Sequence, residues 1–133
     1  MNDDNRLRLV DAAREARGRA YAPYSKYKVG AALLTASGKI YQGVNVENAA
    51  YPTGMCAERV AVFKAVSEGE RQFEAMAVVT SNGGTPCGSC RQVLAEFGLG
   101  TIILIANGEG VILLEQPLSE LLPSAFGADH LSS

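Results

Sequence analysis

Three cysteines and one glutamate carry the clearest chemical signal in this 133-residue sequence. They lie in two short segments, Cys56-Ala57-Glu58-Arg59 and Pro86-Cys87-Gly88-Ser89-Cys90-Arg91. Thiolates are good zinc ligands, and a catalytic zinc ion typically has three protein ligands and one open position. We therefore expect Cys56, Cys87 and Cys90 to bind one Zn²⁺ ion per subunit, with water in the fourth position.

The spacing of the cysteines suits a single ion. Cys87 and Cys90 are three residues apart, so they share one face of a predicted helix, and Cys56 would come from another helix. Three thiolates make such a site net negative, which opposes ionisation of a bound water. Both helices would point their positive N-terminal ends at the ion. Arg59, one turn after Cys56, is expected to offset the charge further by donating hydrogen bonds to the sulfurs.

Glu58 is expected to move protons rather than to bind the metal, because three ligands are already present. It would take a proton from the zinc-bound water. A glutamate considered alone is most often a surface carboxylate. Its place two residues after Cys56 reverses that expectation.

Other interpretations of the cysteines are less favourable. A structural zinc site normally has four protein ligands, and the lone histidine, His130, lies in a polar tail far along the chain from both segments. Buried free thiols can pack as small apolar groups, but here both segments lie at predicted helix starts. An odd number of cysteines without an export signal favours metal binding or catalysis over disulfides.

The elements that must position these residues follow from the apolar periodicity. Helical spacing predicts helices over residues 7–20, 56–68, 89–97 and 117–122. Apolar or alternating runs predict strands over residues 28–35, 39–46, 73–80, 101–106 and 111–115. The first two strands would form a hairpin and the middle of the chain alternates strand and helix. This order predicts an α/β fold with three α/β/α layers and a mixed five-stranded sheet.

Length and composition predict one domain over residues 1–133, with residues 127–133 as a frayed tail. No apolar run approaches the roughly 20 residues of a membrane helix, and the N-terminus is polar, so we expect a cytoplasmic protein without a membrane partner. The net charge is −2 and the basic residues are scattered, which argues against nucleic acid as a partner.

Over most of its length the chain resembles the small homotetrameric cytidine deaminases. The resemblance is carried by the two cysteine segments and by residues 21–27, 43–49 and 121–126. These deaminases belong to the zinc-dependent cytidine/deoxycytidylate deaminase family, whose signature pairs a first ligand and a glutamate with Pro-Cys-x-x-Cys. The resemblance implies hydrolytic deamination of cytidine and deoxycytidine to uridine and deoxyuridine plus ammonia, within pyrimidine salvage. It also implies a homotetramer with composite active sites.

The resemblance assigns the nucleoside contacts residue by residue. Asn45 and Glu47 match the residues that bind the ribose hydroxyls, and alternating residues of a strand point to the same side. Glu58 would hydrogen-bond N3 of the pyrimidine and deliver protons to N3 and to the leaving amine. Ala57 would contact the base through its backbone.

Two aromatic residues complete the implied site. Tyr27 matches a ring that stacks on or lines the base pocket, and Phe126 matches one that reaches into a neighbouring subunit's site. Without the resemblance both would be read as core residues. The family more often has Phe at Tyr27, Cys at Val44 and Thr at Val60. A buried tyrosine hydroxyl needs a hydrogen-bond partner, so Tyr27 in place of Phe requires such a partner near the base pocket.

Three rival functions remain open from the sequence. A deaminase for a cytosine-containing antibiotic of the blasticidin type would share the metal segments but not necessarily Asn45 and Glu47. A polynucleotide cytosine deaminase would need an open groove and a basic track for the backbone. A zinc-stabilised interaction module would bind the metal without turning over any cytosine compound.

Overall fold

The computed structural model describes residues 1–131 of the chain. Its helices are α1 (Asp3–Arg17), α2 (Ala57–Ser67), α3 (Gly88–Ala95) and α4 (Leu118–Leu121), with 3₁₀ turns η1 (Tyr51–Thr53) and η2 (Ala128–Leu131). Its strands are β1 (Gly30–Thr35), β2 (Ile40–Val44), β3 (Phe73–Val79), β4 (Ile102–Ala106) and β5 (Ile112–Pro117). This order of elements agrees with the sequence-based expectation.

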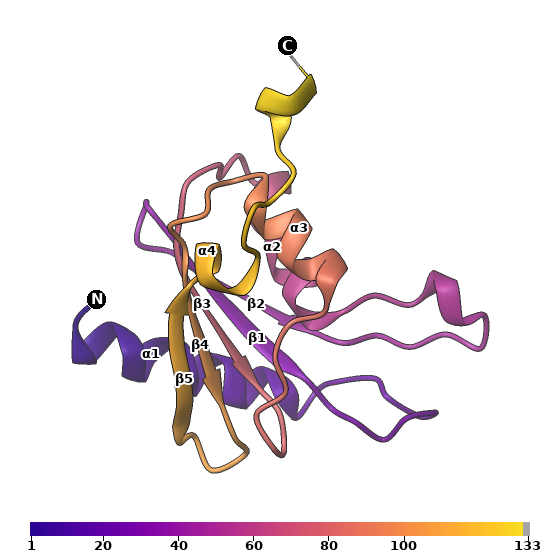
Figure 1. Cartoon of the computed structure of the whole chain (residues 1–133). Coiled ribbons are helices and arrows are strands. Elements are labelled where there is room, and N and C mark those ends of the chain that lie inside the picture. The colour runs from indigo at the N-terminus through magenta and orange to yellow at the C-terminus, as the bar shows by residue number, and fades with distance from the viewer. Residues whose placement is uncertain (132–133) are drawn as a thin grey trace.

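All five strands form one mixed sheet in the order β2-β1-β3-β4-β5 (Figure 1). Strands β3 and β4 pair in parallel, with Ala77 opposite Leu104, and the other neighbours pair antiparallel. The β1–β2 hairpin places Leu33 opposite Tyr41. The parallel pair matters for function because α3 and its cysteines lie in the connection between β3 and β4.

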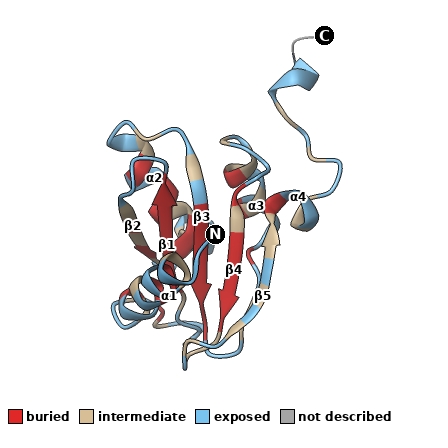
Figure 2. Ribbon diagram, turned by 90° about the vertical axis from the view of Figure 1, so that its left-hand side faces the viewer, coloured by how far each residue is buried: buried red, intermediate tan, exposed pale blue. Residues whose placement is uncertain are grey.

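The sheet has a hydrophobic core on each face, so the three-layer α/β/α prediction is confirmed. Ala31 and Leu33 of β1 pack in a cluster with α2 and α3 residues such as Ala61 and Leu94. The alternate residues of the same strand, including Leu34, pack in a second cluster with α1. Figure 2 shows the buried strands β1, β3 and β4 at the centre of the molecule.

Two glycines let the helices rest directly on the hairpin. A Cβ atom at Gly30 would lie 2.0 Å from the carbonyl oxygen of Ala13 in α1. A Cβ atom at Gly43 would lie 2.2 Å from the carbonyl oxygen of Ala57, the first residue of α2. The position of the N-terminal end of α2 therefore depends on glycine, which has no side chain, at position 43 of β2.

The chain ends differ from the sequence-based boundaries. Helix α1 begins at Asp3 because the side chain of Asn2 accepts a hydrogen bond from the Asn5 backbone, and it ends before Gly18 rather than at residue 20. Residues 128–131 form a 3₁₀ turn in a segment that projects away from the sheet (Figure 1). Residues 132–133 of the expected frayed tail lie outside the described residues. Within residues 1–131, no helix combines the length and the apolar character that crossing a membrane requires.

Candidate active site

The sulfur atoms of Cys56, Cys87 and Cys90 gather in one place and lie within 4.8 Å of one another. Cys56 Sγ is 3.9 Å from Cys87 Sγ, which is 3.3 Å from Cys90 Sγ. Tetrahedral zinc with Zn–S bonds of about 2.3 Å needs sulfurs about 3.8 Å apart. The donor set therefore fits zinc after changes of no more than about 1 Å in the distances between the sulfurs.

No fourth ligand completes this group among the residues that the structure describes. His130 belongs to the projecting C-terminal segment, where its ring stacks on Phe126. A three-sulfur set with an open corner is typical of a catalytic zinc site, whereas structural sites are closed by four ligands. The geometry thus favours the catalytic arrangement.

Two helix starts present the sulfurs. Cys56 is the N-cap of α2 and Cys87 the N-cap of α3, and neither side chain caps its own helix. Cys90 lies in the first turn of α3 and is fully buried. Because the helix N-termini carry partial positive charge, both helices favour anionic sulfur at this point.

Hydrogen bonding favours the thiolate form of Cys56. Bonds from Cys90 and from the Arg59 guanidinium lower the pKa of Cys56 to about 5, and Arg59 Nη2 lies 3.4 Å from Cys56 Sγ. The same contact with Cys56, together with burial, raises the pKa of Cys90. In the metal-free site Cys90 therefore keeps its proton, and metal binding would release it.

Glu58 lies beside the sulfurs in the floor of a cleft and is only 5% exposed. It is the second residue of α2, so it follows Cys56 into the helix. Burial raises the pKa of Glu58, and the charge of Cys56 raises it further. A carboxyl group with a raised pKa can both accept and donate a proton near neutral pH.

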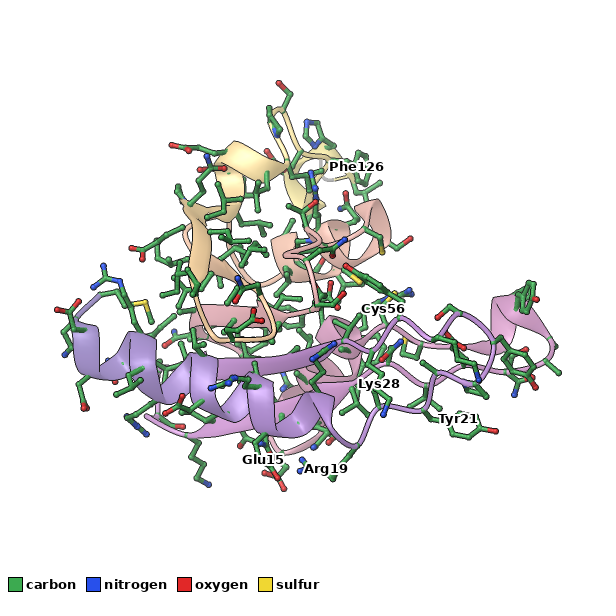
Figure 3. All side chains as sticks on the ribbon, turned by 90° about the horizontal axis from the view of Figure 1, so that it is seen from below. Glu15, Arg19, Tyr21, Lys28, Cys56 and Phe126 are labelled. Atoms are coloured by element: carbon green, nitrogen blue, oxygen red, sulfur yellow. The ribbon has the colours of Figure 1, made fainter. Side chains whose placement is uncertain are left out.

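The cleft above the sulfurs has a volume of about 910 Å³. Its walls come from the segment before β1, the segment after β2, the start of α2 and the loop between β3 and α3. The first two segments protrude side by side, joined by a bridge between Tyr21 and Val46 (Figure 3). The cleft is large enough for a nucleoside and opens between those loops and the cysteine cluster.

Glu47 and Asn45 line this cleft on the side of the protruding loops. Glu47 Oε1 accepts hydrogen bonds from the backbone N–H groups of Tyr24 (2.9 Å) and Ser25 (3.1 Å), and the Ser25 hydroxyl donates to Oε2. These bonds lower the pKa of Glu47, the hydroxyl of Ser25 most strongly. Asn45 Oδ1 accepts from the Val29 backbone, and Asn45 Nδ2 donates to a backbone carbonyl. Both side chains are thus held in fixed orientations.

The other residues expected at the site are divided between two places. Tyr27 and Ala57 line the cleft, with Ala57 fully buried at the start of α2. Phe126 is 55% exposed and lies on the C-terminal segment, apart from the residues that line the cleft (Figure 3). A single chain therefore brings together every expected site residue except Phe126.

Some supporting residues were not assigned a site role from the sequence. Ser25 orients Glu47 through its backbone N–H and its hydroxyl. Nothing in the sequence of residues 21–27 indicates this role. Arg91 donates to the Pro86 carbonyl at 2.8 Å, to the Leu121 carbonyl at 2.7 Å and to the Thr85 hydroxyl at 3.2 Å. It therefore fastens the loop that carries Cys87. Its position directly after Cys90 was the available signal.

Comparison with known proteins decides the family. The family described as "Cytidine and deoxycytidylate deaminase zinc-binding region" matches residues 3–106. The chain belongs to this family. As a member of this zinc-binding deaminase family it is a zinc-dependent hydrolase that acts on C–N bonds, and the three-cysteine cluster supplies the expected metal-binding group. The prediction of a zinc cofactor is thereby confirmed.

Individual relatives agree with the family match over nearly the whole chain. A cytidine deaminase of Sporosarcina psychrophila is 50% identical over 128 residues, covering 94% of this chain and 93% of its own. One from Halalkalibacterium halodurans is 47% identical over 131 residues, covering 96% and 98%. The crystal structure of cytidine deaminase from Burkholderia pseudomallei superposes with a TM-score of 0.86 at 44% identity, covering 95% of this chain and 100% of that one.

Proposed function

We propose that this chain deaminates cytidine and deoxycytidine hydrolytically, giving uridine and deoxyuridine plus ammonia. The observation that carries the proposal is the open three-sulfur group with the buried carboxyl of Glu58 beside it in one cleft. The similarity to proteins named cytidine deaminase supports the choice of substrate.

Cys56, Cys87 and Cys90 would hold the metal ion. When bound, Zn²⁺ would supply Lewis-acid chemistry, lowering the pKa of a water molecule so that a nucleophile is available at neutral pH. Glu58 would accept a proton from the attacking water and donate it to N3 of the pyrimidine. It would then accept the second proton, from the hydroxyl group newly bonded to the base, and pass it to the amine that leaves as ammonia. Its raised pKa suits this alternation between acid and base. Arg59 would stabilise the sulfur charge through its bond to Cys56.

The nucleoside would bind with its sugar toward Glu47 and Asn45. A carboxylate has about four acceptor sites, so Glu47 can accept ribose hydroxyl protons in addition to its bonds from Tyr24 and Ser25. The base would lie against the ring of Tyr27 and contact the backbone of Ala57. A free base without the sugar would lose the contacts of Glu47 and Asn45.

The active protein would be a homotetramer with composite sites. Support comes from Phe126, whose exposed ring lies on the C-terminal segment and is not among the residues that line its own chain's cleft (Figure 3). Such a ring could enter the cleft of a neighbouring copy. A role in pyrimidine salvage and a cytoplasmic location are the corresponding biological predictions.

The substrate assignment is tested by following ammonia release from cytidine, deoxycytidine, free cytosine and single-stranded DNA. We expect turnover of the two nucleosides and little of the other two, because only nucleosides can use Glu47 and Asn45. Good turnover of cytosine alone would contradict the sugar contacts. Bound zinc with no turnover of any cytosine compound would instead indicate a zinc-stabilised interaction module.

The role of Glu58 is tested by Glu58→Ala. We expect this variant to retain zinc and to lose about 10²–10⁴-fold in kcat, the usual contribution of a general acid–base group. Zinc content by metal analysis and kcat on cytidine give the two readouts. An exposed glutamate outside the cleft, Glu109, offers a matched Glu109→Ala control with unchanged kcat. Near-normal kcat in Glu58→Ala would overturn the assignment.

A further inference from the structure

The ring of Tyr27 differs from that of a phenylalanine by a single hydroxyl group, and that group has a specific partner. Tyr27 Oη donates a hydrogen bond of 2.7 Å to Asn82 Oδ1, across 55 residues of sequence. Asn82 belongs to the loop between β3 and α3, which leads to Cys87. The hydroxyl therefore connects two separate walls of the cleft.

On one side, the backbone of Tyr27 is bonded to the residues that hold the sugar-binding carboxylate. The Tyr27 N–H donates to Ser25 Oγ at 3.0 Å, and Asn45 Nδ2 donates to the Tyr27 carbonyl at 2.8 Å. Ser25 in turn donates to Glu47. Any displacement of Tyr27 would thus move the groups proposed to contact ribose.

On the other side, the loop that receives the hydroxyl is itself well anchored. The buried Thr80 hydroxyl accepts hydrogen bonds from the backbone of Gly83 at 2.7 Å and Gly84 at 2.8 Å. Gly84 and Thr85 then line the cleft shortly before Cys87, the N-cap of α3. The Tyr27–Asn82 bond consequently joins two hydrogen-bonded loops, one on the sugar side of the cleft and one on the metal side.

Gly84 preserves the room that this bond needs. A Cβ atom at Gly84 would lie 2.4 Å from Tyr27 Oη, but 3.5 Å from the ring carbon Cζ and 3.9 Å from Thr80 Oγ1. The conflict concerns the hydroxyl oxygen alone. A side chain at this position would push the tyrosine hydroxyl away from Asn82, while a phenylalanine ring would tolerate it.

We propose that Tyr27 and Asn82 form a strut that sets the spacing between the sugar-binding residues and the metal-binding loop. Tyr27 is thus a positioning residue for nucleoside binding through its hydroxyl, beyond any stacking by its ring. This inference rests on the proposed nucleoside deaminase function. It concerns how the substrate is held and leaves the proton transfers of Glu58 unchanged.

The first test compares steady-state kinetics on cytidine for Tyr27→Phe, Asn82→Ala and the double variant. We expect each single variant to raise KM about fivefold, the factor of one net hydrogen bond, with kcat changing much less. Asn82→Ala also removes the 3.5 Å contact of the Thr80 hydroxyl with Asn82 Oδ1, so the double variant should match Asn82→Ala, in which Tyr27→Phe has no further bond to break. Tyr21→Phe is the control, since this hydroxyl in the same segment lies outside the cleft and has no hydrogen-bond partner among the described residues. Unchanged KM in Tyr27→Phe, or additive effects, would overturn the strut.

The second test uses Gly84→Ala and needs no catalysis. We expect Gly84→Ala to lower the melting temperature by about 2–5 °C in the natural chain and by clearly less in the Tyr27→Phe background. Gly100→Ala, where an added Cβ atom meets nothing within 4 Å, gives the matched control. An equal loss in both backgrounds would contradict the strut. Absent cytidine turnover in the unsubstituted protein would instead contradict the proposed function, so the two failures are distinguishable.

Discussion

At the scale of single residues, the cleft holds two carboxyl groups whose surroundings push them in opposite directions. Burial raises the pKa of Glu58, whereas the Ser25 hydroxyl and two backbone N–H groups lower the pKa of Glu47. Diverging pKa values in one site often separate a proton-transfer group from a permanently charged one. Here the separation agrees with a proton carrier at Glu58 and a constant hydrogen-bond acceptor at Glu47.

The state of Glu47 leads to a pH-dependent prediction for Ser25→Ala. A lowered pKa keeps Glu47 ionised as the pH falls, and the Ser25 hydroxyl is its largest cause. Removing the hydroxyl raises the pKa, so Glu47 becomes protonated at a higher pH and stops accepting from the sugar. We expect the acid limb of kcat/KM for cytidine to move to higher pH.

The pH profile of Ser67→Ala provides the comparison, because within residues 1–131 the Ser67 hydroxyl donates only to the Lys64 carbonyl near the end of α2. Its acid limb should coincide with that of the unsubstituted protein. If Ser25→Ala also kept that limb, Glu47 would not be the group whose ionisation governs sugar binding.

At the scale of elements, the two close glycine contacts have different consequences. Alanine at Gly30 or at Gly43 would overpack a helix–strand contact, which typically lowers the free energy of unfolding by about 1–3 kcal/mol. Gly43 contacts the first turn of α2, which carries Glu58 and follows Cys56, whereas Gly30 contacts α1. We expect both variants to be less stable but only Gly43→Ala to lose zinc affinity.

Chemical denaturation measures the stability of both variants, and competition with a chelator measures zinc retention. Gly30→Ala serves as the control for destabilisation alone. Equal zinc retention in the two variants would show that the site tolerates movement of α2.

Most elements could be predicted from the sequence because their periodicity is strong. The buried runs that became β3 and β4, and the helices that begin beside Cys56 and Cys87, are each marked by local residue types. The start of α1 was placed too late because residues 3–6 are polar and lack periodicity, although Asn2 and the acids after it favour a helix start. Local pattern thus located the elements better than their ends.

The clustering of the three cysteines with Glu58 nearby could be predicted from the sequence because each segment is short and chemically distinctive. The Tyr27–Asn82 and Arg91–Leu121 bonds join positions far apart in the chain, so no local pattern indicates them. They depend on how the loops meet over the folded sheet. Supporting contacts of this kind required the structure.

At the scale of the whole molecule, the position of Phe126 leads to a prediction about subunits. If Phe126 completes a neighbour's cleft, Glu58→Ala disables the cleft of its own chain, whereas Phe126→Ala disables the cleft of a neighbouring chain. Mixed tetramers would contain some clefts with Glu58 from one chain and Phe126 from another. We expect a mixture of the two variants, after subunit exchange, to be more active than either alone.

Light scattering determines the oligomeric state of the same samples. A monomer with full activity, or a mixture whose activity is only the average of its components, would contradict composite sites. A gain on mixing would show that one chain's C-terminal segment serves another chain's cleft.

The central claim concerns the metal: three sulfurs and an open corner. X-ray absorption spectroscopy of the zinc-replete protein, combined with metal analysis, tests it most directly. We expect one zinc ion per chain with three sulfur ligands at about 2.3 Å and one oxygen ligand that is exchangeable with solvent. No bound zinc, or a fourth ligand supplied by a protein side chain, would contradict the account.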